Sequence, residues 1–201
     1  MKKVLTVIMS ISLSLVLVFT ATSLSFATTQ STEEIDTRAL NLETIDESEL
    51  PEGIVPIEIT SQEDFDSLVE TLNQPMETEI QNFDNLELAD MNKSSSSSTF
   101  ITRSTTKNMP LSPVKLNLYA KIEVYSSGSF RQILNGSPWT TLTGYGPGVE
   151  WVEEDKDAVV QNNGQSIYVW SEGTFKYYLL INGLIQLYAR DESISFTYSV
   201  Y

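Results

Sequence analysis

The feature that most constrains the fold is a strict alternation of apolar and polar residues early in the C-terminal half. Leu116, Leu118, Ala120, Ile122 and Val124 are separated by single polar or tyrosine residues. Successive side chains of a β-strand point to opposite faces, so this run predicts one long strand with one buried face and one face in water. No helical period of useful length follows residue 112, and we expect the C-terminal half to be all β-structure.

Turn signals divide the rest of this half into further strands. The clearest is Asn182-Gly183, which lies between apolar runs at residues 175–181 and 184–189. Asn-Gly is the residue pair that most favours a two-residue hairpin turn. Together with other glycine-rich turns, the pattern predicts an antiparallel β-sandwich of about seven to nine short strands over residues 113–201. The remaining turn signals lie at residues 126–128, 135–138, 144–148 and 162–164.

A change of composition divides the chain near residue 112. All nine tyrosines, all three tryptophans and eight of the nine glycines follow it. Residues 92–112 contain five consecutive serines, which cannot bury apolar surface, and they predict a flexible Ser/Thr-rich linker. In such a linker Arg103 and Lys107 would be open to trypsin-like proteases.

The N-terminus has the pattern of a secretory signal peptide over residues 1–27. Lys2 and Lys3 precede an apolar stretch up to Phe19, and Ser25-Phe26-Ala27 places small residues at the −3 and −1 positions of a cleavage site after Ala27. The stretch is short and diluted with Ser and Thr, so a retained membrane anchor is the weaker alternative. We expect a secreted, extracellular protein without a stable membrane anchor after cleavage.

Residues 28–91 form an acidic region with one ordered segment. Ile57 and Ile59 alternate like a short strand, and residues 60–63 resemble a capping box, with Thr60 as cap. The apolar spacing that follows predicts a helix over about residues 61–73, whereas residues 28–52 are expected to be disordered. A lone helix cannot cover its apolar stripe. It must dock on the C-terminal domain, a second copy or a partner, and a removable pro-region is one version of this idea.

Charge and composition exclude several function classes. The chain has a net charge of −15, which repels phosphates and makes nucleic acid and anionic membranes poor partners. It contains no histidine and no cysteine, so His- or Cys-dependent nucleophilic catalysis and zinc sites built on these residues are impossible. Carboxylates are the remaining candidates for chemistry.

An acidic cluster surrounds Trp151. Glu150 and Glu153 could act as a glycosidase pair if they face each other across a sugar cleft. The run from Glu154 through Asp155 to Asp157 is more simply a solvated hairpin turn, because turns collect Asp and charge. The same three residues are a weak candidate for a calcium site, since calcium prefers hard oxygen ligands, and we expect no other cofactor.

Aromatic side chains supply the candidate binding residues. Tyr119, Tyr125, Tyr168, Trp170 and Tyr178 all lie opposite the aliphatic or core-facing positions of their strands. If those positions form the core, a Tyr- and Trp-rich sheet face remains outside. Exposed aromatic rings bind sugars or proteins, because each ring offers an apolar face and a polar edge. The alternative is that some of these rings belong to the core.

The favoured hypothesis is therefore a secreted, non-catalytic module that recognises polysaccharide or an extracellular protein through an aromatic-rich sheet face. The first alternative is an antimicrobial or toxin-like effector with an acidic pro-region. A carboxylate-dependent glycosidase and a structural protein of an extracellular matrix are the others. In layout alone, the chain resembles exported bacterial proteins that join a signal, an acidic region and a small β-domain.

Overall fold

A computed structural model describes residues 34–79, 96–110, 113–144 and 146–201. The expected signal peptide and its cleavage site after Ala27 lie outside these residues. No helix in the described ranges is long and apolar enough to cross a membrane.

Sheet B is built around the alternating run of the C-terminal half. Its strand order is β3 (Thr78–Glu79), β4 (Ser97–Asn108), β5 (Lys115–Ser127) and β6 (Phe130–Thr143), and each neighbouring pair is antiparallel. The alternating apolar residues of β5 are fully buried, as the sequence predicts. Residues 135–138, predicted to be a turn, instead continue β6. Pro138 is tolerated there because β6 is an edge strand of sheet B.

Sheet A contains the long β8–β9 hairpin, β8 (Ser166–Ile181) and β9 (Leu184–Ser199). β7 (Val149–Gln161) pairs antiparallel with most of β8, and β2 (Ile57–Ile59) pairs parallel with its last three residues. β1 (Glu43–Ile45) pairs with β9 near the turn. That turn confirms the Asn-Gly prediction, since Asn182 and Gly183 both have positive φ values, 52° and 76°.

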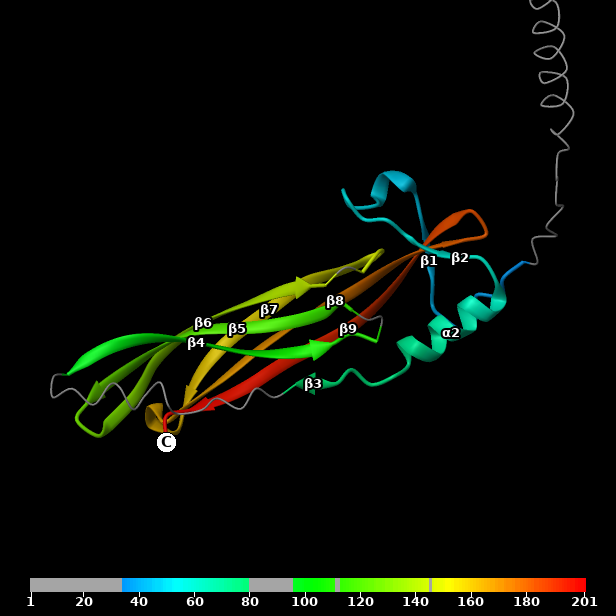
Figure 1. Ribbon diagram of the computed structural model, residues 1–201. Coiled ribbons are helices and arrows are strands. Elements are labelled where there is room, and N and C mark those ends of the chain that lie inside the picture. The colour runs from blue at the N-terminus through cyan, green and yellow to red at the C-terminus, as the bar shows by residue number, and fades with distance from the viewer. Residues whose placement is uncertain (1–33, 80–95, 111–112, 145) are drawn as a thin grey trace, which may run out of the picture. The chain divides into compact units, whose positions relative to one another are not determined.

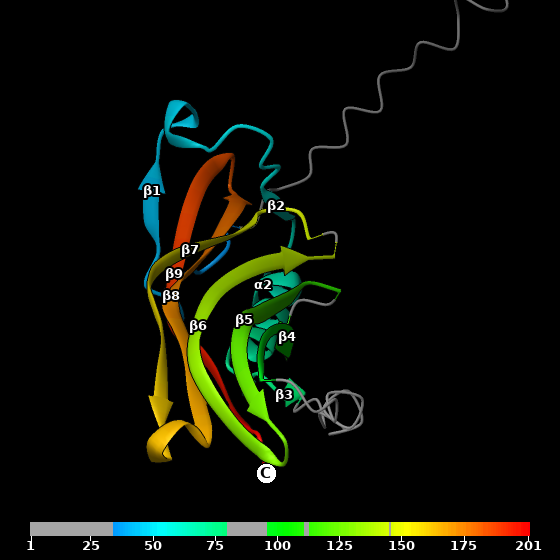
Figure 2. The same ribbon diagram turned by 90° about the vertical axis from the view of Figure 1, so that its left-hand side faces the viewer.

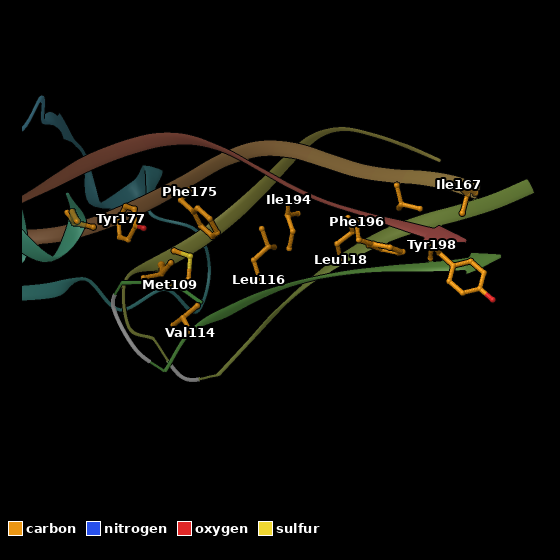
Figure 3. Packing of buried hydrophobic residues seen from close by; sticks show 14 of the residues in the cluster. Met109, Val114, Leu116, Leu118, Ile167, Phe175, Tyr177, Ile194, Phe196 and Tyr198 are labelled. Carbon is orange, nitrogen blue, oxygen red and sulfur yellow. The ribbon is translucent and has the colours of Figure 1, made fainter. Parts of the chain in front are cut away.

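The two sheets pack face to face, and Figure 2 shows β4–β6 as one layer and β7–β9 as the other. Their inner faces form one apolar core, in which Leu116 and Leu118 of sheet B lie with Ile194 and Phe196 of sheet A (Figure 3). The expected all-β sandwich is confirmed. Within residues 113–201, however, it has five long strands, and the other strands come from earlier in the chain.

The helix α2 (Gln62–Leu72) confirms the one predicted helix. Its N-cap is Ser61, one residue later than predicted, and the Ser61 hydroxyl accepts a hydrogen bond from the Asp64 N–H at 3.1 Å. Phe65, Leu68 and Leu72 are buried in the same core cluster as the inner face of β8. Figure 1 shows α2 beside the part of β8 and β9 near their turn. The helix therefore docks on the β-sandwich of its own chain.

Residues 34–52 are more ordered than the sequence predicts. They contain β1 and the short 3-10 helix η1 (Glu47–Glu49), and Ile35 is only 6% exposed. The pairing of β1 with β9 explains the order of this segment, because it satisfies backbone groups that sheet A would otherwise leave open near its hairpin turn. Ile35 is the buried residue of this segment, which lies against the sandwich through Ile35 and the backbone pairing of β1.

The predicted linker at residues 92–112 is wrong for residues 97–108, which form β4. Inward positions of β4 hold Ile101 and Thr105, and the whole strand pairs with β5. Arg103 is only 7% exposed, and its guanidinium lies 5.0 Å from the centre of the Tyr198 ring. The Lys107 ammonium lies 2.6 Å from the Glu192 carboxylate. A second processing point at these two residues is thus a wrong expectation, since both side chains are packed inside the sandwich.

Candidate functional site

The predicted aromatic residues do not share one surface. Tyr119 and Tyr125 alternate with the buried residues of β5, so they lie on the outer face of sheet B. Tyr168 and Trp170 lie on the outer face of sheet A, because they alternate along β8 with Ile167 and Val169, which are fully buried. The outer faces of two packed sheets point in opposite directions. The sequence predicted the orientation of these four side chains, but one shared face was wrong.

Tyr178 is not an exposed binding residue, because it is only 3% exposed. Its hydroxyl donates a hydrogen bond of 2.8 Å to the Glu150 carboxylate. Burial, and then this hydrogen bond to an anionic acceptor, raise the pKa of Tyr178 to about 12. The residue stabilises the join between β7 and β8 and is excluded from the candidate surface.

The outer face of sheet A is hollowed over β8 and β9. A groove of about 300 Å³, here called the aromatic groove, is lined by Tyr168, Trp170, Glu172, Ser193, Ile194 and Ser195. The two rings and Glu172 occupy successive outward positions of β8, so they are separated by about 6.7 Å per step along the strand. The groove therefore presents two partly exposed rings in line with one exposed carboxylate.

The neighbouring strands place polar side chains on both sides of Trp170 and Glu172, whereas Tyr168 lies between Val159 of β7 and Thr197 of β9. Asp157 of β7 and Ser195 of β9 lie directly opposite Trp170. Asp155 and Ser193 flank Glu172 in the same way. Directly opposed residues of antiparallel strands point to the same face of the sheet. Oxygen acceptors thus flank Trp170 and Glu172 on a surface three strands wide.

A second hollow of about 410 Å³ continues from the aromatic groove and shares Glu172 and Ser193 with it. Its other lining residues include Glu154 and Asp191. The Thr174 hydroxyl lies between these two carboxylates, 2.6 Å from Glu154 and 2.9 Å from Asp191. This end of the surface is strongly anionic.

The predicted turn at residues 154–157 is wrong, because these residues lie inside β7 with a β-bulge between Glu153 and Asp155. The calcium site is not supported either. Within the described ranges no group of three or more acidic side chains could hold a metal ion. Asp155 and Asp157 each accept a hydrogen bond from the next backbone N–H, and Glu154 turns to Thr174.

The proposed glycosidase pair does not form across a cleft. Glu150 and Glu153 are three residues apart in one strand, so their side chains point to opposite faces of β7. Glu153 accepts a hydrogen bond of 2.5 Å from Thr140 and forms an ion pair with Lys156. Partial burial opposes its ionisation, but these two partners outweigh burial and lower the pKa of Glu153. A carboxylate held in this way is fixed as an anion between β6 and β7.

The outer face of sheet B carries aromatic residues that the sequence analysis missed. Trp139 of β6 stacks on Tyr119 with ring centres 5.3 Å apart and planes inclined by 10°. Phe130 lies edge-on to Tyr125 at 6.3 Å, and Phe100 is 56% exposed. The turn signal around Pro138 concealed Trp139 as a strand residue. Counting back in twos from Leu142 gives Thr140 and Pro138 on one face of the strand, which leaves Trp139 on the other, outward face.

Comparison with known proteins gives no match, whether to a protein-family model, to a curated protein or to a solved structure.

Proposed function

We propose that the protein is an exported, non-catalytic binding module that holds a polysaccharide in the aromatic groove of sheet A. The observation that carries the proposal is the alignment of Tyr168, Trp170 and Glu172 on one shallow groove of about 300 Å³. Export is inferred from the signal pattern of residues 1–27.

The groove has the chemistry that sugar rings require. An aromatic face stacks on the apolar face of a sugar, while carboxylates and hydroxyls exchange hydrogen bonds with its hydroxyl groups. Trp170 supplies such a face, and Asp157 and Ser195 flank it. From Tyr168 to Thr174 the outward positions of β8 span about 20 Å, which suits a chain of several sugar units better than a single sugar.

Charge narrows the class of polysaccharide. The surface around the groove carries Glu154, Asp155, Asp157, Glu172 and Asp191, whereas Lys176 is the one cation at an outward position of the described part of β8. Carboxylate- or sulfate-bearing chains would be repelled by such a surface. We therefore propose an uncharged polysaccharide as the ligand.

An effector released from a pro-region is not proposed. Residues 34–79 contribute Phe65, Leu68 and Leu72 to the same core as β8 and β9. Removing them would expose the apolar inner face of the β8–β9 hairpin to water. The core therefore favours a protein that works with this segment in place.

The test is a depletion assay with the secreted protein and a panel of insoluble uncharged polysaccharides. We expect saturable retention on at least one of them, and an affinity reduced about tenfold in Trp170→Ala, which corresponds to about 1.4 kcal/mol of binding free energy. Leu184→Ala is the matched control, because Leu184 is 52% exposed in the same hairpin but lies outside the groove. No retention on any polysaccharide, or equal loss in both variants, would overturn the proposal.

A further inference from the structure

We infer that the outer face of sheet B is a second polysaccharide-binding surface and that the protein bridges two polysaccharide chains. This inference rests on the proposed function of the aromatic groove. The surface, here called the sheet B aromatic face, consists of Phe100, Tyr119, Tyr125, Phe130 and Trp139.

The sheet B aromatic face exposes several large aromatic side chains to solvent. Phe100 is 56% exposed, Phe130 51% and Trp139 37%. They come from the two strands on either side of β5, so they spread across the three long strands of sheet B. Exposed apolar surface of this kind on a folded protein marks an interaction site.

The charges on this face nearly cancel and do not select a charged partner. The outward positions of β4, β5 and β6 carry two lysines and one glutamate, and the rest are uncharged. Lys115 lies 3.7 Å from Glu79 of β3, and Glu123 accepts a hydrogen bond from Asn135. The Lys121 ammonium lies over the Phe100 ring at 4.4 Å. In a chain of net charge −15 this face is electrically balanced, so it neither attracts nor repels charged partners strongly.

Hydroxyl-bearing side chains lie beside Tyr119 and Lys121 on this face. Ser104 of β4 lies opposite Tyr119, and Thr102 and Ser137 lie on either side of Lys121. Aromatic rings bordered by hydroxyls and little net charge offer the same type of contact as the aromatic groove, without its carboxylates. A neutral, hydroxyl-rich polymer is the ligand that fits both surfaces.

Because of the sandwich geometry, the two surfaces would bind two different polysaccharide chains. They lie on opposite outer faces of two packed sheets, whose mean planes are about 10 Å apart, so they point away from each other. One short stretch of a stiff polysaccharide cannot contact both. With both faces occupied, each protein molecule becomes a cross-link.

The experiment uses the full secreted protein and a soluble form of the polysaccharide that retains it, with light scattering as the measure of bridging. The wild-type protein is expected to raise scattering in a bell-shaped way as protein concentration increases. Trp139→Ala is expected to lower the scattering about tenfold while the variant is still retained on the insoluble polysaccharide through the aromatic groove. Phe100→Ala, a change at an exposed side chain, serves as a second variant, and thermal unfolding confirms that both variants are folded.

The outcomes separate this inference from the proposed function. Retention without any rise in scattering would overturn bridging while the aromatic groove stands. Wild-type scattering in both Trp139→Ala and Phe100→Ala would overturn the role of sheet B. Scattering by the protein alone that Trp139→Ala removes would assign this face to a second copy of the chain and also overturn the inference. If the protein is not retained on any polysaccharide in the depletion assay, the proposed function itself is overturned.

Discussion

Replacing Phe65 by Ala tests whether α2 is part of the sandwich core. Phe65 is fully buried in the cluster that includes Phe175 and Tyr177 of β8. Removing a buried phenylalanine side chain costs about 3–5 kcal/mol, a large share of the 5–15 kcal/mol that stabilises a typical domain. For a chain of this size each kcal/mol lowers the melting temperature by about 2–4 °C, so we expect a decrease of roughly 6–20 °C.

Tryptophan fluorescence during urea unfolding is the appropriate assay. All three tryptophans lie in strands β6, β7 and β8, and none lies in residues 34–79. A shifted midpoint in Phe65→Ala would therefore report that loss of α2 packing weakens the β-sandwich itself. Val55→Ala, at a side chain that is 61% exposed in the same segment, should change stability by less than about 0.5 kcal/mol. An unchanged tryptophan transition in Phe65→Ala would refute the assignment of α2 to the core.

Two further predictions concern backbone space and pH. Gly148→Ala should be much more destabilising than Gly128→Ala in urea unfolding. Both glycines have positive φ, but only at Gly148 would a Cβ meet other atoms, among them the Tyr178 carbonyl oxygen at 2.5 Å. Equal losses of stability in the two variants would contradict this close approach. Because the folded state lowers the pKa of Glu153, its contribution is present above the unfolded pKa of about 4.3 and is lost as pH falls through the folded value. The destabilisation by Glu153→Gln should thus be about 1 kcal/mol at pH 7 and shrink below pH 4, and a loss independent of pH would contradict the ion pair.

Patterns of residues close together in the sequence predicted β5, the β8–β9 turn and α2 correctly. The alternation of β5, the Asn182-Gly183 turn and the apolar stripe of α2 each depend on neighbours in sequence. β4 was missed because its inward positions include Arg103, Thr105 and Lys107, which gain burial only through long-range partners such as Glu192. A polar strand of this type has no apolar signature.

The candidate site was predictable only in part. Alternation correctly placed Tyr119, Tyr125, Tyr168 and Trp170 outside the core, because it depends on strand parity alone. Which sheet each strand joins depends on pairing between distant segments, so the division into two opposite faces could not be predicted. Tyr178 obeys the same parity but is covered by neighbouring residues that the sequence does not place beside it.

The most direct test of the central claim is fluorescence from Trp170 alone. A Trp139→Phe, Trp151→Phe variant keeps Trp170 in the aromatic groove as the single emitter, and a Trp139→Phe, Trp170→Phe variant keeps only Trp151, which packs on Phe175 at 4.7 Å. When titrated with the polysaccharide that retains the protein, the variant that keeps Trp170 should show a saturable change of emission, because a sugar ring displaces water from the indole face. The Trp139→Phe, Trp170→Phe variant, which retains Trp151, should show no change of emission. Saturable retention with an unchanged Trp170 emission would contradict the assignment of the aromatic groove as the binding site.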